Sequence, residues 1–306
     1  MFAKKHIISM RDFSRAEIDH ILQRAEALET FASERSSDIL AGRILAMLFY
    51  EPSTRTRLSF ETAMKRLGGE TISMVSTEAS SAAKGEMLAD TIRVVGEYAD
   101  VIVLRHPKEG STRMSAEMSD VPIINAGDGA GHHPTQTLLD LYTIKRESNL
   151  RNLNIVLIGD LKYGRTVHSL VYALSLYDAK ISLVSPEELC IPSDIKEDLI
   201  KRRIDVYETT KLEDVMEYAD VVYVTRIQKE RFPDLSEYQK VAGSYRISLK
   251  SLKNCKEDMI IMHPLPRVDE IDTDVDSTKH AKYFKQAFYG VPVRMAVLSL
   301  VLGCDV

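Results

Sequence analysis

Short apolar runs alternate with amphipathic segments along the first half of the chain. Residues 44–50 form a continuous apolar run of the length expected for a buried strand. After it, Phe60, Ala63, Met64 and Leu67 recur at i, i+3, i+4 and i+7, which is helical spacing. This reading predicts strands at 44–50, 71–75, 101–104 and 122–127, and helices at 12–31, from about 58, from about 87 and over 137–142.

The same alternation returns after residue 150. Strands are predicted at 154–160, 180–184, 220–224 and 258–262, and helices at 167–177, 193–203 and 290–303. Strands that alternate with helices are typical of α/β domains with parallel sheets. We therefore expect two doubly wound parallel-sheet domains joined by helices: residues 1–133, completed by a C-terminal helix at 288–306, and residues 134–287.

A cluster of hydroxyl and guanidinium side chains follows the apolar run 44–50. Its sequence is Ser53-Thr54-Arg55-Thr56-Arg57, in a predicted strand-to-helix turn. Free backbone N–H groups and the helix dipole at such a turn attract an anion. Hydroxyl groups and guanidinium forks add donors that match a phosphate. The alternative is an ordinary helix N-cap with solvated arginines.

Further candidates lie at the ends of other predicted strands. Arg105 follows the strand at 101–104, and the turn Gly127–Gly131 follows the next strand. Ligands of parallel sheets bind beyond the carboxyl ends of the strands. His133 and Gln136 come next and are three residues apart, so both can face one site from the first turn of a helix. No carboxylate or cysteine stands at ligand spacing, so no metal site is predicted.

The second half of the chain also places arginines after strands. Arg165 and Arg226 follow the predicted strands at 154–160 and 220–224. Two solvated surface arginines are the alternative. The glycines after residue 158 do not match G-x-G-x-x-G, which disfavours a nucleotide-binding oxidoreductase. The prolines of 263–267 predict an extended turn that could present backbone carbonyls to a ligand amide.

Composition and charge narrow the class of function. The chain has 306 residues and a formal net charge of −5, so it has no basic footprint for nucleic acid. Its three cysteines, Cys190, Cys255 and Cys304, are too scattered for a disulfide framework or a zinc site, and we expect them to be small buried residues. No signal peptide and no apolar run of ~20 residues is evident, so we expect a cytoplasmic protein that binds no membrane.

Taken together, these motifs resemble one known family. In order they are Phe49–Arg57, Lys84–Glu86, Arg105–Pro107, His133–Gln136, Gly159–Thr166, Thr225–Gln228 and His263–Arg267. Over nearly the whole chain they are similar to the aspartate and ornithine carbamoyltransferases. The ornithine branch carries a cysteine where this chain has Pro264, and it has a Ser-Met-Gly loop that this chain lacks. The resemblance is therefore to the catalytic chain of the aspartate branch.

The resemblance implies roles for the matching residues. The phosphate of carbamoyl phosphate is bound by Ser53, Thr54, Arg55 and Thr56, with Arg105 bridging the phosphate and the carbonyl oxygen. Arg55, Thr56 and His133 polarise the carbonyl, and Gln136 with the carbonyls of Leu265 and Pro266 holds the NH2 group. The carboxylates of aspartate are bound by Arg165, Arg226, Gln228 and Lys84.

The implied reaction is attack of the amine of L-aspartate on the carbamoyl carbon, with phosphate leaving. It gives N-carbamoyl-L-aspartate, an early committed step of de novo pyrimidine (UMP) biosynthesis, without a cofactor. The implied assembly is a homotrimer in which Lys84 and Ser80, or Ser81 in the neighbouring register, complete the site of an adjacent subunit. A separate regulatory chain is left open as a partner. The alternatives are an ornithine carbamoyltransferase and, more distantly, a non-catalytic anion-binding module.

Overall fold

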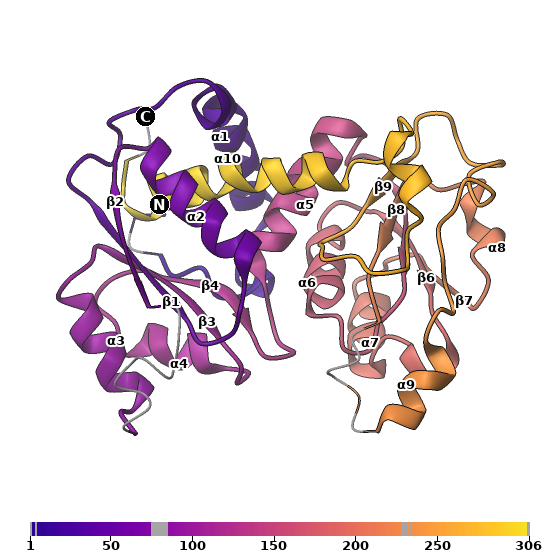
Figure 1. Ribbon diagram of the computed structural model, residues 1–306, viewed down its shortest axis with the longest axis horizontal. Helices are drawn as coiled ribbons and strands as arrows, with labels where there is room; N and C mark the ends of the chain where they lie inside the picture. Colours follow the sequence, from indigo (N-terminus) through magenta and orange to yellow (C-terminus); the bar gives the residue numbers. More distant parts are fainter. Residues whose placement is uncertain (1, 4, 75–84, 228–231, 233, 305–306) are drawn as a thin grey trace. The chain divides into compact units, whose positions relative to one another are not determined.

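The chain divides into two compact units, and each contains its own parallel sheet (Figure 1). The computed structural model describes residues 2–3, 5–74, 85–227, 232 and 234–304. Unit 1 comprises Met1–Tyr142 and Phe288–Val306, and unit 2 comprises Thr143–Ala287. The helices α5 (Pro134–Glu147) and α10 (Tyr283–Val301) each contain residues of both units. The expected α/β class, with two parallel-sheet units joined by helices, is confirmed.

Unit 1 is built on a four-stranded sheet with the order β2-β1-β3-β4, in which every pair is parallel. Apolar residues at alternate positions of β1 and β3 form one core with α3 and α4, while α2 packs on β1 and β2. Figure 1 shows α2 on one side of this sheet and α3 and α4 on the other. The strands are β1 (Ile44–Phe49), β2 (Glu70–Met74), β3 (Val101–His106) and β4 (Ile123–Asp128). The helices are η1 (Met10–Asp12), α1 (Arg15–Ser33), α2 (Thr54–Arg66), α3 (Leu88–Gly96) and α4 (Ser111–Glu117).

Local sequence explains where the helices of unit 1 begin and end. Ser14 caps α1 with a capping box, because its hydroxyl accepts from the Glu17 N–H while the Glu17 side chain accepts from the Ser14 N–H. The helix α2 buries Phe60, Ala63 and Met64, the positions that predicted it. It ends before Gly68, whose φ is +81°.

Unit 2 has a five-stranded parallel sheet with the order β7-β6-β5-β8-β9. One core joins alternate residues of β5, β8 and β9 to α8 and to the irregular segments that follow β9. The strands are β5 (Asn154–Ile158), β6 (Lys180–Val184), β7 (Val206–Thr209), β8 (Val221–Val224) and β9 (Ile260–Met262). The helices are α6 (Arg165–Leu174), η3 (Glu187–Leu189), α7 (Ser193–Lys201), α8 (Glu213–Met216), α9 (Leu235–Val241) and η5 (Thr273–Ser277).

Each sheet has one point at which the strand order reverses. In unit 1 the reversal lies between β1 and β3, and in unit 2 it lies between β5 and β8. In doubly wound folds the connections that leave two such strands turn to opposite faces of the sheet, and ligands bind beyond the carboxyl ends of the strands at this point. The two reversal points are therefore where ligands are expected.

Some expectations about the elements were wrong. The last helix starts at Tyr283 rather than at residue 290, and α4, β7 and α9 were not predicted. The three cysteines are not buried: Cys190 is exposed, and Cys255 and Cys304 are partly exposed. The reason is position, since Cys190 follows η3 in a connection and Cys304 follows α10. Residues 75–84, which include Lys84 of the family motifs, lie outside the described residues.

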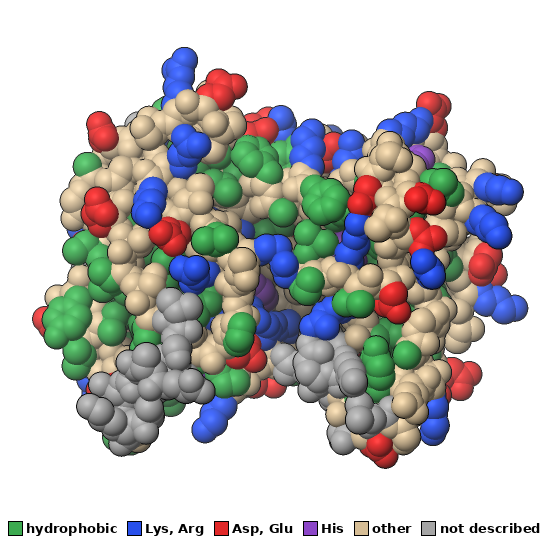
Figure 2. All heavy atoms as spheres, in the orientation of Figure 1, with side chains coloured by type: hydrophobic (Ala, Val, Ile, Leu, Met, Phe, Trp, Pro, Cys, Tyr) green, Lys and Arg blue, Asp and Glu red, His purple; other side chains and the backbone are tan. Residues whose placement is uncertain are grey.

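Surface charge is mixed rather than segregated. On the face in Figure 2, basic and acidic side chains are interspersed over each unit. No helix among the described residues has the length and apolar content needed to cross a membrane. Attraction of an anion therefore depends on local groups, to which the strand ends of each unit contribute.

Candidate active site

The turn between β1 and α2 forms the first part of the candidate site in unit 1. Ser53 is the N-cap residue of α2, with extended backbone, and its side chain makes no capping hydrogen bond within the described residues. Thr56 is buried, whereas Thr54 and Arg55 are exposed. The first turn of a 13-residue helix thus presents its free N–H groups together with hydroxyl and guanidinium groups. This arrangement can bind a phosphate.

Arg105 is the penultimate residue of β3 and lies directly beside this turn. Its Cα is paired with that of Phe49, the last residue of β1, so it stands at the reversal point of the sheet. Its Nη1 donates to the carbonyl of Ala126 at 3.1 Å, and its Nε lies 3.5 Å from Oε2 of Glu51. Only 14% of the Arg105 side chain is exposed. The guanidinium group is therefore held in place from two sides.

A buried carboxylate organises the turn that leads from β4 to His133. The side chain of Asp128 accepts hydrogen bonds from Gly110 N, Thr112 Oγ1, Asn125 Nδ2 and His132 N, at 2.9–3.1 Å. In an irregular turn some backbone N–H groups have no backbone acceptor, and the carboxylate of Asp128 accepts hydrogen bonds from them instead. The residues before His133 are thereby fixed to β4 and to the start of α4.

Gly129 allows this turn to close tightly. Its φ is +52°, and a Cβ at this position would lie 2.8 Å from the Pro107 carbonyl oxygen. His133 then precedes α5, and its carbonyl accepts from the N–H groups of Gln136 and Thr137. The His133 side chain is 4% exposed. His133 thus stands directly before the first turn of α5, and Gln136 lies within that turn.

The strand ends of unit 2 carry the two expected arginines. Arg165 is the first residue of α6, after β5, and Arg226 follows β8 by two residues. Both side chains are half-buried. Thr225 joins the two strand ends, because its hydroxyl donates to Ile158 O at 3.2 Å and accepts from Asp160 N at 3.1 Å. Both arginines therefore follow strands that meet at the reversal point of this sheet.

The turn after β9 is held by a buried His–Glu pair. His263 Nδ1 accepts from Leu265 N at 2.7 Å, so its Nε2 carries the proton and donates to Glu270 Oε1 at 2.6 Å. Oε2 of Glu270 accepts from the N–H groups of Val268 and Asp269, each at 3.0 Å. Burial alone would raise the pKa of Glu270, but these hydrogen bonds, led by that from His263, lower it.

The turn held by this pair contains the carbonyl oxygens of Leu265 and Pro266. Leu265 has a φ of +54°, a conformation that costs a non-glycine residue about 1–2 kcal/mol. The carbonyl oxygens of Leu265 and Pro266 accept no hydrogen bond from the residues that the structure describes. They can therefore accept from a ligand N–H group.

Three of the predicted site residues cannot be placed. Ser80 and Lys84, with the alternative Ser81, and also Gln228, lie outside the described residues. Sequence reasoning also overlooked four carboxylates that hold the site: Glu51, Asp128, Asp140 and Glu270. Asp140 could have been found, because it stands one helical turn after Gln136 at i+4. The other three depend on contacts that no periodicity records.

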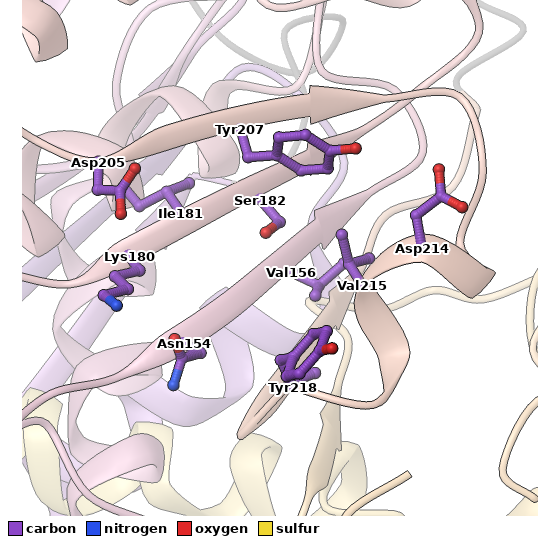
Figure 3. A pocket seen from close by; sticks show the side chains of 11 residues that line it. Asn154, Val156, Lys180, Ile181, Ser182, Asp205, Tyr207, Asp214, Val215 and Tyr218 are labelled. Atoms are coloured by element: carbon purple, nitrogen blue, oxygen red, sulfur yellow. The ribbon is translucent and has the colours of Figure 1, made fainter. Parts of the chain in front are cut away.

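Unit 2 also has a hollow at the opposite ends of its strands. Its volume is about 270 Å³, and it is lined by the first residues of β5 and β6, by Tyr207 of β7 and by Tyr218 after α8 (Figure 3). Parallel strands have all their amino ends on one side, and Arg165 and Arg226 lie beyond the other. None of the predicted site residues that the structure describes lines this hollow.

Comparison with known families gives two matches that together span nearly the whole chain. Residues 5–146 match the family model described as the carbamoyl-P binding domain of aspartate/ornithine carbamoyltransferase. Residues 151–301 match the model described as the Asp/Orn binding domain of the same enzymes.

Relatives and solved structures agree with these matches. The aspartate carbamoyltransferase catalytic subunit of Methanothrix thermoacetophila is 64% identical over 302 residues, which is 99% of each chain. The catalytic subunit of M. jannaschii aspartate transcarbamoylase has a TM-score of 0.91 and 59% identity, covering 98% of this chain and 99% of that one. Trypanosoma cruzi aspartate transcarbamoylase in complex with carbamoyl phosphate and aspartate has a TM-score of 0.94 and 43% identity, covering 98% of each chain.

Proposed function

The chain belongs to the aspartate/ornithine carbamoyltransferase family, and we propose for it the activity of an aspartate carbamoyltransferase. It transfers the carbamoyl group of carbamoyl phosphate to the amine of L-aspartate, which yields N-carbamoyl-L-aspartate for pyrimidine synthesis. The observation that carries this function is the α2 N-terminus, with Arg105 beside it at the reversal point of the sheet. Full-length relatives named for the aspartate reaction decide between the two branches.

Unit 1 is proposed to bind carbamoyl phosphate. The phosphate of this ligand accepts hydrogen bonds from the N–H groups of the α2 turn and from the side chains of Ser53, Thr54, Arg55 and Thr56. Arg105, held by Glu51 and the Ala126 carbonyl, reaches both the phosphate and the carbonyl oxygen. His133, with Arg55 and Thr56, polarises that carbonyl. Gln136 accepts from the NH2 group. On the strength of the resemblance, the carbonyls of Leu265 and Pro266, in unit 2, belong to the same proposed set.

Unit 2 is proposed to bind L-aspartate. Its two carboxylates are ligands for guanidinium groups, which bind a carboxylate through two parallel hydrogen bonds. Arg165 and Arg226 supply these groups at the ends of β5 and β8. Gln228 and Lys84 belong to the same proposed set, on the strength of the resemblance alone.

The proposed chemistry needs no nucleophilic side chain of the protein. The aspartate amine attacks the carbamoyl carbon, a tetrahedral oxyanion forms, and the carbon–oxygen bond to phosphate breaks. The amine loses a proton as the new carbon–nitrogen bond forms, and the departing phosphate dianion can accept it. Catalysis then comes from holding two anions together and from stabilising the developing oxyanion by Arg55, Arg105 and His133.

The assembly and location are part of the same proposal. A homotrimer is supported by the resemblance, in which Ser80 and Lys84 of one subunit complete the site of the next. A regulatory chain is a further candidate partner, since the relatives are named as catalytic subunits. The proposed place of work is the cytoplasm. Light scattering of the purified chain would measure the trimer directly.

A parallel turnover assay tests the function. Purified protein receives carbamoyl phosphate with L-aspartate in one reaction and with L-ornithine in another, and ureido product is measured. Product with aspartate alone is expected. Product with ornithine alone would keep the phosphate site but reject the proposed ligand of unit 2. Binding of carbamoyl phosphate without product from either amine would favour a non-catalytic anion-binding module.

A further inference from the structure

A buried polar chain runs behind Gln136 in unit 1. Nε2 of Gln136 donates to Oδ1 of Asp140 at 2.9 Å, one turn further along α5. Asp140 is completely buried, and Gln136 is 9% exposed. The Oε1 atom of Gln136 makes no hydrogen bond to any described residue. Among the described residues, the amide is thus anchored through its nitrogen alone.

The chemistry of Asp140 determines which way this amide faces. An ionised carboxylate can only accept hydrogen bonds, so the NH2 end of Gln136 must turn toward it. The Oε1 end must then turn away, where it can accept from a ligand. If residue 140 were a group able both to donate and to accept, either orientation of the amide would be allowed. The flipped amide would present NH2 to the NH2 of a ligand.

Arg294 supplies the opposite charge that a buried carboxylate needs. It lies in α10, is 3% exposed, and interacts electrostatically with Asp140. Burial lowers the pKa of Arg294 to about 10, against the opposing effect of Asp140, so it stays charged at neutral pH. Its Nη1 donates to Gly290 O at 3.1 Å, while its Nε has no hydrogen-bond partner among the described residues. A buried ion that is only partly satisfied costs stability, which favours a functional reason for its presence.

The same arginine also reaches the helix of the phosphate turn. Its guanidinium carbon lies 5.0 Å from the ring centroid of Phe60 in α2. Phe60 follows Thr56 by one helical turn, and both are buried on the same face. One cation therefore packs against α2 and balances the charge that orients Gln136 on α5.

We propose that Asp140, with Arg294 as its counter-charge, is a positioning residue that holds the Oε1 of Gln136 toward the carbamoyl NH2. The pair would thereby select carbamoyl phosphate against acyl phosphates that have no NH2 group. This inference rests on the proposed function, in which Gln136 contacts the carbamoyl group. If the inference is correct, changing Asp140 removes the preference for carbamoyl phosphate over acyl phosphates. Unfolding or damage to the phosphate site would instead weaken the binding of both kinds of ligand.

Three ligands separate the parts of the site. Carbamoyl phosphate carries NH2 and phosphate, acetyl phosphate replaces NH2 by methyl, and inorganic phosphate has neither. Calorimetric titration without aspartate measures the affinity for each without turnover. Asp140→Asn allows both orientations of the Gln136 amide, so it should weaken carbamoyl phosphate binding by about twofold or more, and binding of the other two ligands should stay as in the wild type.

A reversed pair provides the rescue. In Q136E/D140N the new amide at 140 donates to one oxygen of the new carboxylate at 136, and the other oxygen faces the ligand. The preference for carbamoyl over acetyl phosphate should return. If D140N alone fails to fold, this double variant carries the test, and its having no preference while folded would overturn the proposal. Thr137→Val, a buried isosteric change on the same helix, is the matched control and should keep the preference.

Two other results would reject the inference in distinguishable ways. Equal weakening of all three ligands in D140N, or an unchanged preference, would reject the positioning role alone. A wild-type protein that does not prefer carbamoyl phosphate, or a Gln136→Ala variant that keeps the preference, would reject the proposed contact of Gln136 as well.

Discussion

The two units use the same sheet architecture but prepare their ligand groups differently. In unit 1 the candidate groups sit on regular elements: the α2 N-terminus, the last residues of β3 and the first turn of α5. Buried carboxylates hold them, Asp128 at one turn and Asp140 behind Gln136. In unit 2 Arg226 stands in an irregular segment, and the 263–270 turn depends on one His–Glu pair.

This difference matches the proposed ligands. A phosphate is compact and symmetrical, so fixed N–H groups at a helix end suit it, and little rearrangement is needed. Aspartate presents two carboxylates that point in different directions, so long arginine side chains suit it better. We therefore expect changes in unit 1 to affect the chemical step and changes in unit 2 to affect mainly the affinity for the second substrate.

The largest effect should come from Arg105→Ala. This change removes a positioned donor to the developing oxyanion and should lower kcat by ~10²–10³. Arg55→Ala and His133→Ala should behave alike. Steady-state turnover with both substrates saturating measures it. Arg113→Ala is the control, because Arg113 lies on α4 with an exposed side chain paired to Asp12. A folded Arg105→Ala protein with full activity would reject the proposal that Arg105 of unit 1 stabilises the oxyanion.

Arg226→Ala, in unit 2, should change the affinity for aspartate rather than the chemical step. Losing a charge-assisted hydrogen bond to a carboxylate should raise the KM for aspartate roughly 10- to 100-fold. Binding of inorganic phosphate, measured separately, should not change. Arg202→Ala, an exposed arginine of unit 2 paired with Asp198, serves as the control. A parallel loss of phosphate affinity would show that the two units do not divide the ligands as proposed.

Gly129→Ala tests how rigid the turn before His133 must be. The new Cβ would meet the Pro107 carbonyl at 2.8 Å and Glu109 N at 2.9 Å. Gly42→Ala is the matched control, since Gly42 also has positive φ, +78°, but nothing within 4 Å. Gly129→Ala should be less stable than Gly42→Ala by about 1–3 kcal/mol because of overpacking. Urea unfolding gives both values, and equal losses would mean that the turn is compliant.

The smallest expected effect is the change in the stability contribution of Glu270 as the pH falls. Its pKa is lowered from the ordinary 4.5, so its contribution to stability is present above that value and is lost as pH falls through the lowered pKa. Glu270→Gln should be less stable than the wild type at pH 7, and the difference should shrink below pH 4.5. The slope involved is at most ~1.4 kcal/mol per pH unit. A difference that stays constant from pH 7 to pH 3 would contradict this account.

The sequence by itself determined the elements and most candidate residues. The apolar run 44–50 and the spacing from Phe60 to Leu67 predicted β1 and α2, because a buried strand and an amphipathic helix leave local periodicities. Some short elements were not predicted: β7, for example, has four residues and is partly exposed, so it shows no buried run. Most motif residues were found from their types and from their places after strands, whereas Ser80 and Lys84 came only from the resemblance to the family.

Only the tertiary structure decided which of these residues meet, and what holds them. The pairing of β1 with β3 places Arg105 beside the α2 turn, although β2 and α3 lie between them in the chain. The chain from Gln136 through Asp140 to Arg294 joins α5, near the middle of the sequence, to α10, near its end. Strand order and the partner of a buried charge follow from non-local packing, which leaves no period in the sequence. Local sequence patterns therefore identified the chemical groups, and the tertiary structure determined how these groups are arranged.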